Sequence, residues 1–344
     1  MRSELFELCR LNGVSGDENV VREYIREKAA PYADSMRTDA MGNLIVFKKG
    51  KKSTGNKLLI AAHMDEVGLI VTRITDDGFL KFDFVGGVDR RVAIGKPVRL
   101  GPEGVPGIIG LKAIHLVKRD EMKKTPKTDA LYVDIGAKNR EEALKLVQPG
   151  TYGSFVGEPE EFGDGMLKAK AIDDRAGCAI MLDLIRQELP MDVTFAFTVQ
   201  EEVGTRGAQV AAQTVKPDIA IVFEGSPADD TFTPDYLIQT ALGKGPMLRH
   251  IDARMITNPR FIRYAIDLGE ELGIPVQEAV RTGGSTNGAP IHLSNMGVPV
   301  IVVGLPVRYI HTHHCYASFC DFENSVKLAV EIIKRLNGDI IKSF

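Results

Sequence analysis

Residues 193–204 form a strand pattern that ends in two adjacent carboxylates. The run Val193-Thr194-Phe195-Ala196-Phe197-Thr198-Val199 is almost entirely β-branched or aromatic, which is typical of a central strand buried on both faces. Glu201 and Glu202 follow at once. A buried carboxylate without a partner is costly, so solvent exposure is the simplest interpretation of an isolated Glu-Glu pair. Other predicted strands also end in residue types that bind metals, which favours a functional role for this pair over simple solvent exposure.

Histidines and carboxylates recur where other predicted elements begin or end. Strands are predicted at 57–62, 218–224 and 298–304, and a helix at 173–188. The carboxyl ends of parallel strands meet at one edge of an open α/β sheet, so residues distant in sequence come together there. The residues placed at this edge are His63, Asp65, Asp173, Asp174, Glu201, Glu202, Glu224 and His311.

Two histidines with several carboxylates make a suitable ligand set for two divalent ions. Zinc is expected first, with cobalt or manganese as alternatives. Such ions lie about 3.5–4 Å apart and need a shared carboxylate and a bridging water. Asp173 is predicted to be shared, with His63 and Glu224 on one ion and Glu202 and His311 on the other. At this point His313 and His314 remain alternatives to His311.

Two carboxylates of the set are left for other roles. Asp65 lies two residues from His63 on an extended segment, so it can accept the second imidazole N–H and select the tautomer. Glu201 is predicted to be the general base that takes a proton from the bridging water and delivers it to a leaving amine. The predicted chemistry is hydrolysis of an amide or peptide bond.

The pattern of elements predicts two domains. Residues 1–68 and 165–344 alternate between strands and helices and are expected to form one three-layer α/β/α domain. Residues 69–164 contain short strands separated by Gly and Pro turns, which predicts an inserted β-barrel-like domain. Strands 43–47 and 57–62 are predicted to form a hairpin with a lysine-rich turn. The charge-rich segment 118–127 is predicted to be an exposed loop.

Composition excludes several classes of function. The formal net charge of −3 gives no electrostatic support for binding nucleic acid or an anionic membrane. We find neither a transmembrane run nor a signal peptide. The four cysteines lack Cys-x-x-Cys spacing, so no disulfide framework is expected, and Cys315 and Cys320 are interpreted as packed thiols. A cytoplasmic location is the expectation.

The chain resembles the dinuclear metallo-aminopeptidases of the glutamyl/deblocking aminopeptidase family, which includes the tetrahedral (TET) aminopeptidases and members labelled endoglucanase. Four segments carry the resemblance in the family's order. They are Ala62-His63-Met64-Asp65-Glu66-Val67-Gly68, Ala171-Ile172-Asp173-Asp174-Arg175-Ala176-Gly177, Gln200-Glu201-Glu202-Val203-Gly204-Thr205-Arg206-Gly207 and Arg308-Tyr309-Ile310-His311-Thr312. The last segment favours His311 over His313 and His314.

The resemblance implies an N-terminal aminopeptidase that acts on peptides with a free N-terminus. It also implies that the insert 69–164 is a PDZ-like dimerisation domain and that the chain forms a homo-oligomer, from a dimer up to a dodecamer. A cis peptide bond between Asp173 and Asp174 is expected from the family. Residue preference at the cleaved position and the physiological metal do not follow from it.

Two segments depart from the family pattern. Glu224 stands where relatives often carry Asp, which lengthens this ligand by one methylene. The segment Gly283-Gly284-Ser285-Thr286-Asn287 replaces a Gly-Gly-Thr-Asp-Ala pattern, so the acidic residue is missing and Thr286 marks the change. Both departures bear on the substrate.

Other functions are consistent with parts of the pattern. The same metals would serve a deacylase or amidohydrolase acting on a small N-acyl compound. A glycosidase would need two opposed carboxylic acids and no metal. A non-catalytic oligomeric binding protein is the alternative from another class, and Glu201 beside a complete ligand set argues against it.

Overall fold

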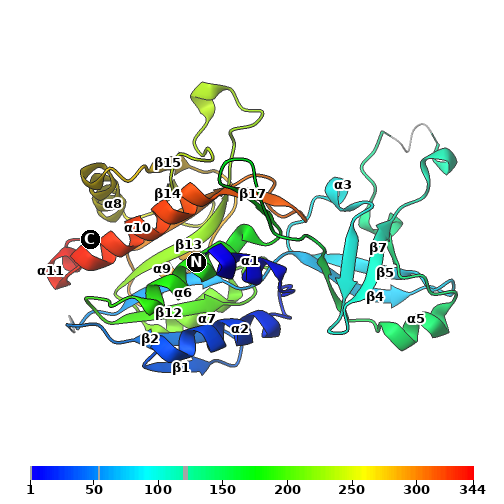
Figure 1. Cartoon of the computed structure of the whole chain (residues 1–344), viewed down its shortest axis with the longest axis horizontal. Coiled ribbons are helices and arrows are strands. Elements are labelled where there is room, and N and C mark those ends of the chain that lie inside the picture. Colours follow the sequence, from blue (N-terminus) through cyan, green and yellow to red (C-terminus); the bar gives the residue numbers. More distant parts are fainter. Residues whose placement is uncertain (1, 53–54, 119–122) are drawn as a thin grey trace.

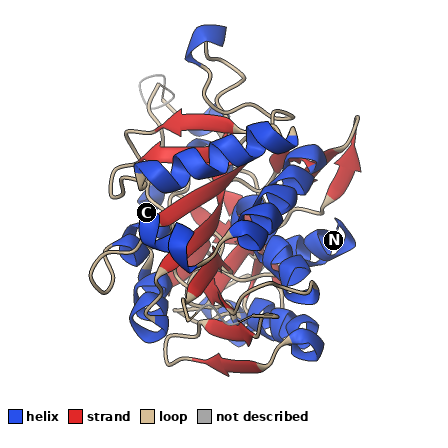
Figure 2. Cartoon of the chain, turned by 90° about the vertical axis from the view of Figure 1, so that its left-hand side faces the viewer, coloured by secondary structure: helices blue, strands red, loops and turns tan. Residues whose placement is uncertain are grey.

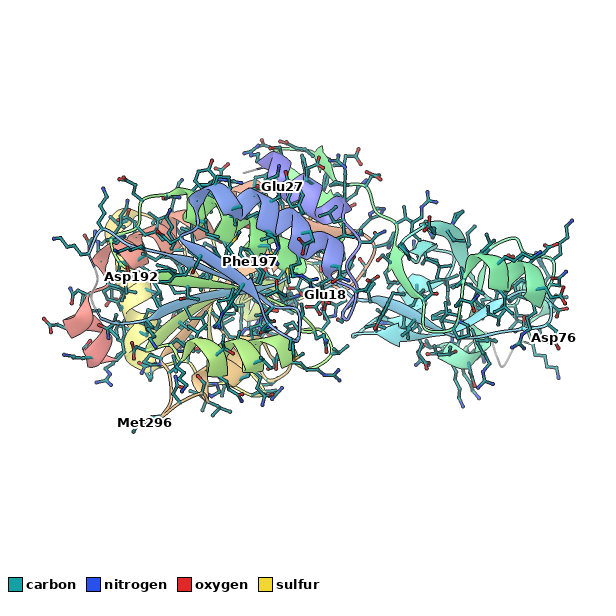
Figure 3. All side chains as sticks on the ribbon, turned by 90° about the horizontal axis from the view of Figure 1, so that it is seen from below. Glu18, Glu27, Asp76, Asp192, Phe197 and Met296 are labelled. Atoms are coloured by element: carbon teal, nitrogen blue, oxygen red, sulfur yellow. The ribbon has the colours of Figure 1, made fainter. Side chains whose placement is uncertain are left out.

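The chain folds into two lobes, a layered α/β domain and a smaller barrel (Figure 1). The computed structural model describes residues 2–52, 55–118 and 123–344. Residues 119–122, in the predicted loop 118–127, lie outside this description. Phe197 lies within the layered domain, Glu18 on its side facing the barrel, and Asp76 at the far end of the barrel (Figure 3). No helix in the described ranges has the length and apolar character that a bilayer-spanning helix needs.

The layered domain is built on a mixed sheet that, within the described residues, has eight strands. Their order is β1-β2-β12-β3-β13-β16-β14-β15. The strands are β1 Ser35–Thr38, β2 Leu44–Lys48, β3 Leu58–His63, β12 Val193–Thr198, β13 Ile219–Pro227, β14 Met247–Ile251, β15 Gln277–Val280 and β16 Val300–Val307. Neighbouring strands among β12, β3, β13 and β16 pair in parallel, so their carboxyl ends share one edge. Thr198 pairs with His63, which brings β12 and β3 to the same level at that edge.

Helices cover both faces of the sheet, as the sequence predicted (Figure 2). Leu58, Ile60 and Ala62 of β3 pack into the core on the side of α1, α2, α6, α8 and α10, whereas Leu59 and Ala61 pack against α7 and α9. The helices are α1 Arg2–Arg10, α2 Asn19–Ala29, α6 Ile172–Arg186, α7 Arg206–Val215, α8 Pro259–Leu272, α9 Gly288–His292, α10 Phe319–Arg335 and α11 Gly338–Ser343. This burial on both faces explains why the central strands β3, β12, β13 and β16 are apolar along most of their length.

The predicted hairpin between residues 43–47 and 57–62 is wrong. β12 lies between these two strands, antiparallel to β2 and parallel to β3. The lysine-rich connection is held against the segment before β12, because Lys51 N–H donates to the carbonyl of Leu189 and Lys52 N–H to that of Pro190. A strand inserted from far along the chain leaves no local sequence signal.

The inserted segment forms a closed barrel with strand order β4-β5-β8-β7-β6-β9. Its elements are β4 Gly68–Ile74, β5 Leu80–Val85, α3 Arg90–Ala93, β6 Pro97–Leu100, β7 Val105–Gly110, β8 Tyr132–Asp134, α5 Arg140–Leu146 and β9 Tyr152–Phe155. The barrel has its own buried core, which includes Leu69, Phe82, Val98 and Val133. This agrees with the fold class predicted for the insert.

A small third sheet connects the segment after the barrel to the end of the chain. β10 Glu160–Phe162 pairs with β11 Met166–Ala169, which pairs with β17 Cys315–Ser318. β17 follows directly after the segment that contains His311. Short 3₁₀ turns lie at Ala30–Tyr32, Ile114–Leu116, Thr128–Ala130 and Asp235–Leu237. Cys315 is buried as predicted, but Cys320 is exposed.

Candidate metal centre and active site

The predicted site residues come from separate elements that end at the same edge of the sheet. His63 is the last residue of β3, Glu224 lies in β13, and Asp173 lies in the first turn of α6. Glu202 follows β12 after a short turn, and His311 follows β16. The parallel pairing of these strands converts their separation in sequence into proximity.

His63, Asp173 and Glu224 form the first of two groups that could hold a cation among the described residues. The ring Nε2 of His63 lies 3.3 Å from Asp173 Oδ1 and 3.6 Å from Glu224 Oε1. The other ring nitrogen, Nδ1, lies 3.1 Å from the backbone carbonyl oxygen of Asp65. Donation of the Nδ1 proton to this carbonyl leaves Nε2 as the ligand atom.

Asp173, Glu202 and His311 form the second group. The ring Nε2 of His311 lies 3.1 Å from Glu202 Oε2 and 3.4 Å from Asp173 Oδ2. Its Nδ1 lies 3.0 Å from the carbonyl oxygen of Gly87, which belongs to the barrel. His313 and His314 are in neither group, and their rings pack against each other with centroids 4.3 Å apart.

Asp173 belongs to both groups because its two carboxylate oxygens face different histidines. The peptide bond between Asp173 and Asp174 is cis, as expected. The N–H of Gly225 donates to Asp173 Oδ1 at 2.9 Å. A Cβ atom at position 225 would lie 2.4 Å from Asp173 Cβ, so only glycine allows β13 to approach this carboxylate so closely.

The electrostatics of the two groups favour cations. Burial lowers the pKa of His311, but hydrogen bonds to Asp173 and Glu202 outweigh it and raise the pKa to about 11. Burial raises the pKa of Glu224 to about 7. Its Oε2 is buried without a hydrogen-bond partner among the described residues. Imidazole and carboxylate ligands converging at these distances, with a buried oxygen left over, fit divalent cations that would displace the protons.

Glu201 lies beside the two groups and is a member of neither among the described residues. It lines the same cavity as Asp173, Glu202, Glu224 and His311. Burial, followed by the nearby Glu224 carboxylate, raises its pKa well above the ordinary value. A buried carboxylate with a raised pKa at the edge of a ligand cluster is the arrangement expected of a group that exchanges protons.

The sequence matches the family model of the M42 glutamyl aminopeptidases over residues 42–328. The chain belongs to this family. Among curated relatives, a protein of Acetivibrio thermocellus is 40% identical over 337 residues, covering 96% of this chain and 98% of the relative. The glutamyl aminopeptidase of Lactococcus lactis is 31% identical and covers 98% of each chain. The lysyl aminopeptidase of Pyrococcus furiosus is 30% identical and covers 94% of each.

Solved structures of M42-like aminopeptidases have the same fold. The TET aminopeptidase from a thaumarchaeote of marine sediment has a TM-score of 0.95 and 35% identity, covering 99% of both chains. The TET1 peptidase of Pyrococcus horikoshii, described as assembling into a tetrahedron or a large octahedral shell, has a TM-score of 0.87 and 33% identity. This match covers 97% of our chain and 99% of that one.

In this M42 chain, the carboxylate of Asp65 anchors the turn that carries Glu201 and Glu202. Asp65 Oδ1 accepts from Glu201 N–H and Oδ2 from Glu202 N–H, both at 3.0 Å. Ser15 Oγ also donates to Oδ2, at 2.6 Å. The carboxylate is 3.5 Å from His63 Nδ1, farther than its own backbone carbonyl oxygen, so its main contacts differ from the predicted one. It therefore fixes the backbone of Glu201 and Glu202 together.

We expect Asp65→Asn to lower turnover without unfolding the protein. An asparagine can accept from only one of the two backbone N–H groups and turns a donor toward the other. Losing a charge-assisted hydrogen bond and adding this repulsion should reduce kcat/KM at least about tenfold. Steady-state kinetics with saturating metal measure the loss, and circular dichroism checks the fold. Turnover equal to wild type would show that the anchor is dispensable.

Three buried charged residues, Glu66, Lys170 and Arg175, pack next to the candidate site, and the sequence analysis did not identify them. Lys170 Nζ lies 2.6 Å from Glu66 Oε1, and Gly13 N–H donates to the same oxygen at 3.0 Å. Arg175, fully buried, donates to the carbonyls of Met64 and Leu8 at 2.7 and 2.6 Å. Glu66 and Arg175 lie within two residues of Asp65 and Asp173. The cluster therefore connects the end of α1 to the segments that contain His63 and Asp173.

Proposed function

We propose that this protein removes single residues from the free N-termini of peptides by hydrolysis at two divalent cations. As an M42 family member with TET aminopeptidase neighbours, it is a metal-dependent aminopeptidase. The observation that carries the two-cation proposal is the position of Asp173. Its Oδ1 faces His63 at 3.3 Å and its Oδ2 faces His311 at 3.4 Å, so one carboxylate joins two ligand groups.

In this proposal His63 and Glu224 would hold one cation, Glu202 and His311 would hold the other, and Asp173 would be a ligand common to the two groups. Such cations polarise a carbonyl and lower the pKa of water, and zinc, cobalt or manganese suit these ligands. The backbone carbonyls of Asp65 and Gly87 orient the imidazoles of His63 and His311 by contacting their Nδ1 atoms. Metal analysis of the purified protein by mass spectrometry identifies the ion.

Glu201 acts as the general base in this proposal. It takes a proton from the water that attacks the peptide carbonyl. It then delivers this proton to the nitrogen of the leaving amine as the C–N bond breaks. Burial of Glu201, followed by the nearby Glu224 carboxylate, raises the pKa of its carboxyl group, which brings it closer to the pKa of the groups with which it exchanges protons. Asp65 holds the backbone of Glu201 in place.

A panel of aminoacyl-anilides tests the proposed function. The protein is stripped of metal, reloaded with zinc, cobalt or manganese, and assayed on free-amine and N-acylated substrates. We expect metal to restore hydrolysis of free-amine substrates alone. Hydrolysis of the N-acylated substrates alone would indicate a deacylase, and no hydrolysis of either class by the reloaded protein would contradict the aminopeptidase proposal.

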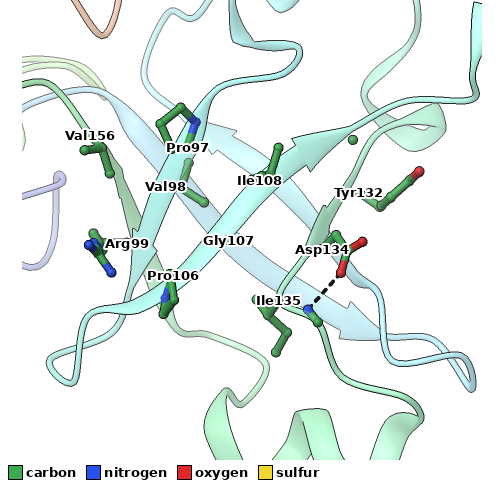
Figure 4. A pocket seen from close by; sticks show the side chains of 12 residues that line it. Pro97, Val98, Arg99, Pro106, Gly107, Ile108, Tyr132, Asp134, Ile135 and Val156 are labelled. Atoms are coloured by element: carbon green, nitrogen blue, oxygen red, sulfur yellow. Dashed lines mark hydrogen bonds between the residues drawn. The ribbon is translucent and has the colours of Figure 1, made fainter.

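We also propose that the barrel mediates assembly into a homo-oligomer. An open groove of about 630 Å³ lies on its surface, lined in part by Pro97, Ile108, Tyr132 and Ile135 (Figure 4). Ile108 is 56% exposed, so apolar surface is available for a partner subunit. The assemblies described for the TET1 peptidase of P. horikoshii support this role by analogy. Light scattering on the full chain measures the number of subunits. A monomer in solution would contradict the proposed assembly.

A further inference from the structure

The turn after β12 is held through three consecutive backbone N–H groups, each of which donates to a buried carboxylate. The N–H groups of Glu201 and Glu202 donate to Asp65, and the N–H of Gln200 donates to Glu18 Oε1, all at 3.0 Å. Glu18 is only 4% exposed. It lies on the side of the layered domain that faces the barrel (Figure 3). The second carboxylate therefore comes from a segment to which the proposed function gives no role.

The side chain of Glu18 contacts this turn and not the helix that it begins. Glu18 is the N-cap residue of α2, a position where a short polar side chain usually accepts from the first N–H groups of its own helix. Glu18 makes no such capping bond. Its Oε1 accepts instead from the N–H of Gly16 at 2.9 Å and from that of Gln200. A buried carboxylate placed in this way stabilises the turn after β12.

The backbone of Gln200 needs support from outside the turn. Its φ angle is +56°, in the left-handed region that residues other than glycine rarely adopt. Such a conformation persists when the surrounding contacts fix it. Gln200 lies directly before Glu201, so its conformation sets the direction in which the chain enters the turn. The hydrogen bond from its N–H to Glu18 is one of the contacts that fix this direction.

The loop that carries this carboxylate is fixed independently of the turn. The carbonyl of Gly13 accepts from Glu66 N–H at 2.9 Å, and Ser15 N–H donates to the carbonyl of Glu66 at 3.3 Å. Gly16 has a φ of +97°, and a Cβ atom there would lie 2.6 Å from the hydroxyl oxygen of Tyr152, in β9 of the barrel. The loop is therefore held by the segment after β3 and packed against the barrel. Its carboxylate approaches the turn from a fixed support.

We propose that Glu18 is a positioning residue for the reaction. By accepting from Gln200 N–H, it sets the direction of the turn and so the place of the Glu201 carboxylate. It acts through the backbone, whereas Asp65 holds the next two N–H groups directly. This inference rests on the proposed role of Glu201 as general base, and it adds a contribution from the loop before α2 to that role.

Two substitutions separate the reach of the Glu18 side chain from its charge. Glu18→Gln keeps an acceptor oxygen at the same reach, whereas Glu18→Asp keeps the charge but is one methylene shorter. On a free-amine anilide we expect kcat to fall about tenfold or more in Glu18→Asp, as for the loss of a hydrogen bond to a charged acceptor, and to fall less in Glu18→Gln. KM and metal content should not change, because Asp65 still holds Glu202. The same two substitutions at Glu27, whose side chain on α2 is 78% exposed, are the matched controls and should leave kcat unchanged.

Two further measurements distinguish positioning from a general effect on stability. Hydrogen exchange of the peptide that contains Gln200, followed by mass spectrometry, should be faster in Glu18→Asp than in wild type. The melting temperature of Glu18→Asp should stay near that of wild type, because Asp is favoured at an N-cap. A residue that only stabilised the fold would lower the melting temperature and leave kcat per folded, metal-loaded molecule unchanged.

Several outcomes would overturn the proposal. Wild-type kcat in both Glu18 variants would show that the contact is dispensable. A higher kcat in Glu18→Asp than in Glu18→Gln would assign the effect to charge and not to reach. Unfolding of Glu18→Asp would make Glu18 a stability residue. Absence of hydrolysis by the wild-type protein would instead contradict the proposed function, while faster exchange at Gln200 would still show that Glu18 holds the turn.

Discussion

Glu201→Gln is expected to abolish turnover while leaving the metal content unchanged. Glutamine has nearly the same shape but cannot take a proton from water, and general-base catalysis contributes about 100- to 10,000-fold. The Glu201 carboxylate is in neither ligand group among the described residues, so no ligand is removed. Its backbone N–H still donates to Asp65, which keeps the turn in place. Single-substrate kinetics measure the turnover, and metal analysis of the same preparation measures the metal content.

The neighbouring Glu202 is the matched control. Glu202→Gln makes the same chemical change one residue along the same turn, but removes a carboxylate 3.1 Å from His311 Nε2. It should lower the metal content as well as turnover, and excess metal should restore part of the activity. If Glu201→Gln also lost metal, Glu201 would be a ligand. If it kept full turnover, another group would be the base.

Asp173→Asn is the second change with a large expected effect, and it should reduce binding of both cations. Asp173 is the only described residue common to the two ligand groups. An amide has one neutral oxygen, so it cannot serve both sides as a carboxylate does. We expect metal content to fall below one ion per chain and the stabilisation that metal gives the folded state to disappear. Metal analysis and thermal unfolding with and without added metal measure both effects.

Asp174→Asn is the control for this prediction. Asp174 lies next in the chain and is equally buried, but it accepts from Gly177 N–H and belongs to neither group among the described residues. It should retain two ions per chain. Two ions retained in Asp173→Asn would contradict the shared role of Asp173, and one retained ion would assign Asp173 to a single group.

Most members of the two candidate cation groups could be picked out from the sequence because a local pattern marks their positions. Buried strands are recognisable from β-branched and aromatic runs, and a polar residue at their end is conspicuous. His63 ends β3, Glu202 follows β12, and Glu224 ends the strand predicted at 218–224, although β13 continues to Pro227. His311 follows a strand by a loop, where neighbouring histidines compete, so the family motif was needed to select it.

Other features of the site could not be predicted because backbone groups supply them. The carbonyls of Asp65 and Gly87 orient the two imidazoles, and any residue type has a carbonyl. The position of β12 between β2 and β3 depends on pairing across long sequence separations. Thr286, flagged as a departure from the family, is fully buried, and its hydroxyl accepts from Gly288 N–H. Ser285 lines the cavity instead.

The hydrogen bond from His311 to Gly87 makes the two lobes chemically dependent on each other. Gly87 lies between β5 and α3 in the inserted barrel, whereas His311 follows the last parallel strand of the other lobe. Excising the insert to obtain a minimal enzyme would therefore remove the acceptor that the Nδ1 side of the His311 ring contacts. Recombining barrels between relatives would require this single contact to be preserved. The two lobes are separate units of the fold, but the candidate metal centre uses contacts from both of them.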